Sequence, residues 1–167
     1  MLINDGIPTW EDIQGVMPSP ERLAKGPVAI AECFQKIPCN PCTKACVKKA
    51  IKVEPDINQT PKVDFDVCNG CGLCLLQCPG LAIFIVDMTF SETHALVKLP
   101  FEFLPLPEVG QFACGLNRAG EEMGYFEVHR VVKGKGKNLT SKIELLIPKD
   151  LAMEVRNIKA GGYRNNG

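Results

Sequence analysis

The sequence has no long apolar run. Nowhere do about 18 or more apolar residues follow one another, so no membrane span is expected. The opening residues, MLINDGIPTWEDIQG, are polar and acidic, and they do not resemble a secretory signal peptide. The formal net charge is zero, from 19 basic and 19 acidic side chains, which does not suit a nucleic-acid-binding surface. We therefore expect a cytoplasmic protein with no membrane span and no nucleic-acid partner.

Motifs for catalysis are also missing. No GxGxxG follows a strand-like run, and there is no flavin-binding motif. His94 and His129 have no spacing to each other or to carboxylates that suggests a catalytic pair. The KGKGKN run at 133–138 lacks the pattern of a phosphate-binding loop and indicates a solvated hairpin turn instead. We therefore expect the chain not to be an enzyme by itself.

The sequence is rich in cysteine, with nine in all. Residues 68–79 read CNGCGLCLLQCP, the CxxCxxCxxxCP spacing that bacterial ferredoxins use to bind 4Fe-4S clusters. Gly70 and Gly72 would let the loop approach the inorganic sulfides closely. Zinc is the main competing metal, but structural zinc sites usually combine two separate CxxC pairs. The triple spacing therefore favours an iron-sulfur cluster, and a reducing compartment suits so many thiols.

The chain contains an internal repeat. Residues 39–53, CNPCTKACVKKAIKV, align without gaps on residues 71–85, CGLCLLQCPGLAIFI, at an offset of 32 residues. Each half consists of a cysteine loop, a short helical turn and an apolar strand. Residues 28–90 thus resemble the dicluster bacterial ferredoxins, in which the fourth cysteine of each motif ligates the cluster of the other motif.

This cross-wiring implies two 4Fe-4S clusters with four cysteine ligands each. The resemblance assigns Cys33, Cys39, Cys42 and Cys78 to cluster 1, and Cys46, Cys68, Cys71 and Cys74 to cluster 2. The first half is irregular, because Lys36 occupies the position of its first ligand and Cys33 is the substitute. If Cys33 is instead a buried free thiol, cluster 1 would be a 3Fe-4S form, use another ligand or be missing. The ninth cysteine, Cys114, is expected in the core.

The fold class expected is α+β. We predict an irregular lead-in over 1–27, a dicluster ferredoxin domain of two pseudo-symmetric hairpin and short-helix halves over 28–90, and a β-rich docking domain over 91–160. Residues 161–167 would be a tail. In the lead-in, Ser19 and Pro20 indicate a helix start, and Trp10 should pack on the main body or on another subunit. The alternating runs after residue 91 predict a small antiparallel β-barrel or sandwich.

The whole chain resembles one further class of protein. Its ECFQKIPCNPC opening and its β-rich part ending in LLIPKDLAMEVRNIK are similar to the small 4Fe-4S subunits of multi-subunit FAD-dependent dehydrogenases acting on proline, hydroxyproline and related amino acids or amines. The resemblance implies an electron-transfer subunit with flavin-containing partner subunits in a hetero-oligomer. Two alternatives stay open: a free ferredoxin-like carrier, and a structural or sensing metal-cluster module.

Overall fold

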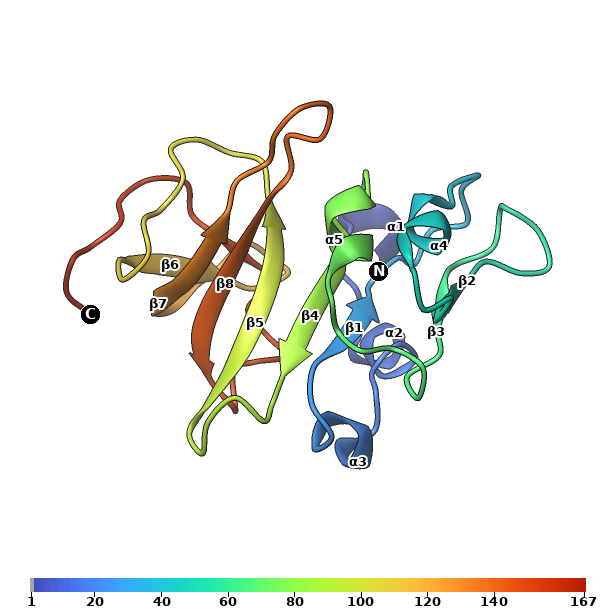
Figure 1. Cartoon of the computed structure of the whole chain (residues 1–167), viewed down its shortest axis with the longest axis horizontal. Coiled ribbons are helices and arrows are strands. Elements are labelled where there is room, and N and C mark those ends of the chain that lie inside the picture. The colour runs from blue at the N-terminus through green and yellow to red at the C-terminus, as the bar shows by residue number, and fades with distance from the viewer. Residues whose placement is uncertain (1) are drawn as a thin grey trace.

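The computed structural model describes residues 2–167, in which the helices are short and lie in the first half of the chain and the longest strands lie in the second half (Figure 1). The helices are α1 Leu2–Asp5, α2 Trp10–Gln14, α3 Pro20–Leu23, α4 Pro41–Ala45 and α5 Leu73–Gln77. The strands are β1 Val28–Ala31, β2 Ile51–Lys52, β3 Lys62–Val63, β4 Ile83–Asp87, β5 His94–Phe101, β6 Phe112–Leu116, β7 Glu122–Val132, β8 Ser141–Pro148 and β9 Asn157–Ile158. None of the helices in residues 2–167 has the length and apolarity needed to cross a membrane.

A seven-stranded antiparallel sheet dominates the molecule. Its strand order is β1-β4-β5-β8-β7-β6-β9, and β2 and β3 form a separate two-stranded hairpin. The predicted antiparallel strands are present, but the barrel of the predicted barrel or sandwich is not closed: within residues 2–167, the edge strands β1 and β9 do not pair with each other, so the sheet is open. The reason is that β4 of the cysteine-bearing part pairs with β5, and the sheet extends into that part instead of closing on itself.

Strands β1 and β4 contribute residues to two apolar cores. In Figure 1 the two strands lie between the long strands on one side and α4 and β2 on the other. Side chains alternate along a strand, so each strand supplies both cores. Ile30 and Phe84, which are register partners, belong to the core of the large sheet. Ala29 and its partner Ile85 belong to the core that contains cysteines. This two-strand ribbon therefore couples the packing of the β-rich part to the cysteine-bearing part.

The internal repeat is visible in the backbone. Helices α4 and α5 have the same length and begin 32 residues apart, at Pro41 and Leu73. Lys49 and Leu81, again 32 residues apart, are the two non-glycine residues with positive φ among residues 2–167, at 58° and 52°. Such a left-handed conformation is uncommon for lysine and leucine. Its recurrence at equivalent positions indicates that both halves turn in the same way after their last cysteine.

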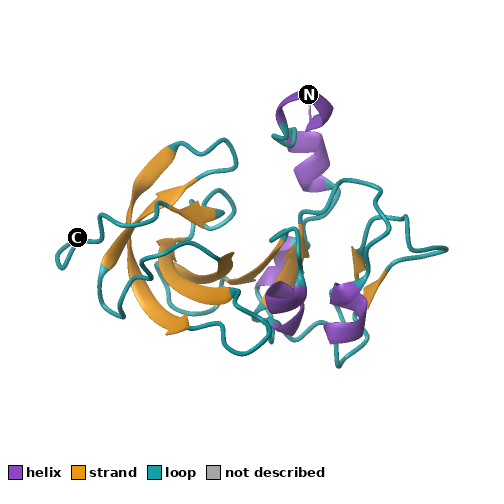
Figure 2. Cartoon of the chain, turned by 90° about the horizontal axis from the view of Figure 1, so that it is seen from above, coloured by secondary structure: helices purple, strands orange, loops and turns teal. Residues whose placement is uncertain are grey.

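The lead-in helix α3 begins as its sequence predicts, with the Ser19 side chain accepting a hydrogen bond from the Arg22 amide and Pro20 in the first turn. Trp10 is 57% exposed, so most of its surface is not covered by the main body of this chain. Figure 2 shows the helices next to the N-terminus standing apart from the sheet. The alternative prediction, contact with another subunit, stays a prediction.

Candidate metal centres

Four cysteines line a first pocket, which has about 380 Å³ of empty space including its open mouth. They are Cys33, Cys39, Cys42 and Cys78. Cys33 follows β1, Cys39 precedes α4, Cys42 lies within α4 and Cys78 follows the last residue of α5. The pocket thus draws three cysteines from the first half of the repeat and one from the second. The structure places the irregular Cys33 with the other three, although ligation by these thiols stays a prediction.

A second pocket, with about 290 Å³ of empty space, has the complementary composition. Its cysteines are Cys46, Cys68, Cys71 and Cys74. Cys46 follows α4 and crosses over from the first half, while the other three come from the loop before α5 and from α5 itself. The two pockets therefore have the two sets of cysteines that the sequence predicts, including the exchange of Cys46 and Cys78. Among residues 2–167, no three His, Cys, Asp or Glu side chains are placed to hold a single metal ion.

The thiols within each pocket affect one another electrostatically. Burial, followed by the negative charge of Cys78, raises the pKa of Cys42 to about 11. Burial and the charge of Cys68 likewise raise the pKa of Cys74 to about 12. Thiols are the ligands of iron-sulfur clusters only as thiolates. Each donor set fits such a cluster, because bound iron supplies the positive charge that makes deprotonation of clustered thiols favourable.

Backbone amides point at the sulfur atoms of three of these cysteines. The Ala50 amide donates to Cys46 Sγ at 3.2 Å, and the Ala82 amide donates to Cys78 Sγ at 3.4 Å, at equivalent positions of the repeat. The Ala29 amide donates to Cys68 Sγ at 3.4 Å. Hydrogen bonds to ligating sulfur stabilise the thiolate and tune the reduction potential of a cluster. Both pockets therefore have backbone donors suited to an anionic cluster.

Arg22 of the lead-in holds the loop of the second pocket. Its guanidinium donates to the Cys68 carbonyl at 2.7 Å and to the carbonyls of Phe65, Gly26 and Pro27. Four backbone acceptors thus share one cation, which fixes the lead-in and the cysteine loop against each other. The sequence contains no local signal for these contacts, because Arg22 and Cys68 are 46 residues apart.

Gly70 lies against the lead-in segment in a conformation that favours glycine. Its φ is +67°, and a Cβ atom there would lie 2.5 Å from Pro27 Cβ and 2.6 Å from the Pro27 carbonyl carbon. The absence of a side chain at Gly70 therefore leaves room for Pro27 of the lead-in segment. Gly72 also has positive φ, +82°, and lies directly before α5.

The turn between β7 and β8 contacts the cysteine-bearing part. The Asn138 side chain donates to the Leu76 carbonyl near the end of α5 at 2.7 Å, and it accepts from the Thr140 amide at 3.0 Å. The KGKGKN run does form a hairpin turn, but sequence reasoning missed this contact. Cys114 is buried within β6, as expected for a core thiol, and it lines neither cysteine pocket.

Comparison with known proteins identifies part of the chain. A model of the 4Fe-4S binding domain matches residues 61–84, which include Cys68, Cys71, Cys74 and Cys78. The ferredoxin-type protein NapF of Haemophilus influenzae is 37% identical over 61 residues, or 35% of this chain and 35% of that protein. NapF of Escherichia coli K12 is 35% identical over 52 residues, or 30% of this chain and 32% of that protein.

The matched segment thus spans about a third of these curated relatives. No solved structure matches the chain. The chain therefore contains a ferredoxin-type 4Fe-4S binding domain, and the β-rich part after it lies outside the matched family model.

Proposed function

We propose that this chain is a non-catalytic electron-transfer protein that carries two 4Fe-4S clusters. The observation that carries the proposal is the pair of four-cysteine pockets related by the internal repeat. Clusters ligated entirely by cysteine have no open iron site for a substrate, and when bound they accept and release single electrons. The cysteine sets assigned above hold cluster 1 and cluster 2, respectively.

The two helices of the repeat would connect the clusters. Helix α4 places Cys42 in the first pocket and leads to Cys46 in the second, while α5 places Cys74 in the second pocket and leads to Cys78 in the first. Residues four apart in a helix are separated by about 6 Å along its axis. The pockets are therefore neighbours, which suits a short relay because electron transfer slows steeply with distance.

The surface of the second pocket offers a place for electron exchange. Cys71 is exposed, while the remaining cysteines are buried or half-buried. Leu73, which is 44% exposed, lies close by in α5. An exposed ligand next to apolar surface is suited to contact with a redox partner. We propose that electrons enter or leave the chain at this side.

We infer that the partners are flavin-containing subunits of a cytoplasmic dehydrogenase, assembled with this chain as a hetero-oligomer. A reduced flavin on the partner would give up one electron at a time, and an acceptor on another partner would take it, so this chain is unchanged after each turnover. Neutral charge and exposed apolar side chains support a fixed subunit. Trp10 is 57% exposed, Phe103 58% and Leu104 80%.

A free ferredoxin-like carrier is the second candidate. The exposed Cys71 favours it, because an accessible cluster also serves transient partners. The two candidates differ in what accompanies the chain. A fixed subunit co-purifies with flavin-containing chains in constant ratio, whereas a carrier separates from its partners in modest salt.

An anaerobic preparation from the native source tests the proposal. We expect iron and acid-labile sulfide, an electron paramagnetic resonance (EPR) signal after reduction, and flavin-containing chains in fixed ratio. A flavin-free monomer that turns over with unrelated reductases would favour the free carrier over the fixed subunit. Iron that cannot be reduced, or zinc in its place, would contradict electron transfer altogether.

A further inference from the structure

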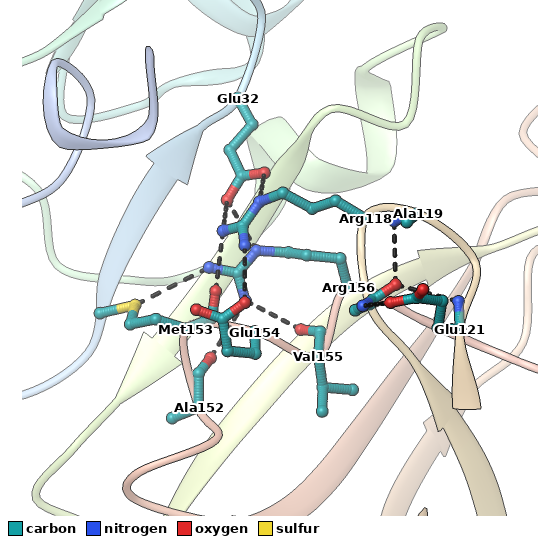
Figure 3. A network of polar contacts seen from close by, with 10 residues as sticks. Glu32, Arg118, Ala119, Glu121, Ala152, Met153, Glu154, Val155 and Arg156 are labelled. Atoms are coloured by element: carbon teal, nitrogen blue, oxygen red, sulfur yellow. Dashed lines mark hydrogen bonds and ion pairs between the residues drawn. The ribbon is translucent and has the colours of Figure 1, made fainter. Parts of the chain in front are cut away.

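Glu32, the residue before Cys33, lies in a network of charged side chains (Figure 3). Arg118 donates to both carboxylate oxygens of Glu32, from Nε to Oε2 at 2.8 Å and from Nη2 to Oε1 at 2.7 Å. Arg156 Nε donates to Oε1 at 2.7 Å. Two guanidinium groups from the β-rich part therefore hold one carboxylate of the cysteine-bearing part.

The network is buried and its arginines are fixed by further contacts. The side chains of Glu32, Arg118 and Arg156 are 7%, 9% and 4% exposed. Arg118 also donates to the Met153 carbonyl, and Arg156 donates to the Ala152 and Val155 carbonyls. Groups held by this many short hydrogen bonds in a dry environment have one preferred arrangement. The carboxylate position is therefore set by the β-rich part.

The backbone of Glu32 connects this network to the first pocket. Its amide donates to the Ala82 carbonyl at 2.8 Å, and the Ala82 amide donates to Cys78 Sγ at 3.4 Å. Cys33 follows directly in the chain. Fixing Glu32 thus fixes the start of the loop that carries Cys33, beside the residue that contacts Cys78.

Cys33 needs such an anchor more than the other cysteines do. The regular position of the first ligand is Lys36, which is exposed and does not line the pocket. Residues 32–40 form no helix or strand. In the second half, by contrast, the equivalent loop is held by Arg22 through the Cys68 carbonyl.

We propose that Glu32 is a positioning residue for Cys33, and that Arg118 and Arg156 act through it to complete cluster 1. The proposal rests on the proposed function, since it presupposes cluster 1. Part of the role of the β-rich extension is then to position, by this contact, the irregular ligand Cys33. A purely structural ion pair would instead stabilise the chain without any preference for cluster 1.

Glu32→Gln in the full-length protein separates these two roles. It keeps the side-chain size and removes the charge that both arginines share. After anaerobic preparation and mild oxidation with ferricyanide, the variant should fall from about eight to about seven iron atoms per chain. In this change one iron leaves as Fe²⁺ and one electron passes to ferricyanide, which leaves a three-iron cluster with an EPR signal in the oxidised protein. Cys39→Ala should lose cluster 1, so the EPR signals that remain in it are those of cluster 2. Glu32→Gln should keep these cluster 2 signals unchanged.

Glu122→Gln is the matched control. Glu122 accepts from Lys159 at the same distance, 2.7 Å, but this pair is exposed, at 57% and 61%. The control should keep about eight iron atoms under the same treatment. Arg118→Lys keeps the charge and loses the two-point contact, so it should show a weaker loss of iron even if Glu32→Gln fails to fold.

Two results would overturn the inference while leaving the proposed function intact. One is full retention of iron in Glu32→Gln and Arg118→Lys, with wild-type signals from both clusters. The other is equal loss from both clusters, which is what general destabilisation produces. If the wild-type protein itself lacks cluster 1, the proposed two-cluster function fails and the inference fails with it.

Discussion

The two cysteine pockets have the same backbone framework but are anchored differently. The second pocket takes three cysteines from one regular motif, and Arg22 holds its loop through the Cys68 carbonyl. The first pocket takes Cys33 from an irregular segment, which is anchored through Glu32 to Arg118 and Arg156. Duplication of a motif thus preserves helix positions and turns, while the contacts that hold each loop come from distant and unrelated parts of the chain.

The two pockets also differ in how far their cysteines are exposed to solvent. Cys71 of the second pocket is exposed, whereas Cys33, Cys39 and Cys78 of the first are half-buried and Cys42 is buried. Solvent exposure and hydrogen bonds to sulfur both influence the potential of a cluster. The two proposed clusters should therefore differ in potential, which would give the relay its direction.

We expect the largest effect from replacing a cysteine that lies in one motif but in the pocket of the other. Cys78→Ala should remove the first cluster, although Cys78 lies in the second motif, with a loss of about four of about eight iron atoms. Its remaining EPR spectrum should match that of Cys39→Ala. Cys114→Ala, which changes a core thiol outside both pockets, should keep all of its iron. A Cys78→Ala spectrum that matches Cys71→Ala would break the assignment.

Gly70→Ala should damage the second pocket alone. The added Cβ would clash with Pro27 and force alanine to a φ of +67°, at a cost of about 3 kcal/mol in stability. We expect cluster 2 signals to bleach at lower guanidinium concentration than in the wild-type protein. Gly80→Ala is the control, because a Cβ there meets no atom within 4 Å. Equal bleaching of both variants would show that the contact with Pro27 is unimportant.

Arg22→Met should weaken the same pocket less severely. It removes the charged donor from four carbonyls, including that of Cys68, and we expect a loss of roughly 2 kcal/mol. Lys25→Met, on an exposed residue of the same segment, should be near neutral. The measurement is again the guanidinium midpoint for bleaching. Greater sensitivity of cluster 1 than of cluster 2 would contradict the separate anchoring of the pockets.

Asn138→Ala should have the smallest effect. Loss of its hydrogen bonds to the Leu76 carbonyl and from the Thr140 amide should cost about 1 kcal/mol. Lys137→Ala, at an exposed neighbour, serves as the control. If the guanidinium midpoint of Asn138→Ala equals that of the control, the contact between this turn and α5 does not contribute to stability.

Local sequence patterns predicted the parts of the structure that depend on neighbouring residues. The cysteine spacing and the 32-residue repeat identified both sets of pocket cysteines, and Ser19 with Pro20 located the start of α3. The failures concern contacts between distant segments. Alternation after residue 91 predicted strands but not that β5 would pair with β4 and keep the sheet open. Glu32 likewise meets Arg118 only after folding, 86 residues away.

If one chain holds two four-iron clusters, as proposed, the iron content of the intact protein reveals both. Iron and acid-labile sulfide should be measured on an anaerobic full-length preparation, with the EPR spectrum recorded after full reduction. We expect about eight of each per chain and an EPR spectrum with magnetic interaction between two reduced clusters. About four of each, with the spectrum of a single isolated cluster, would contradict it.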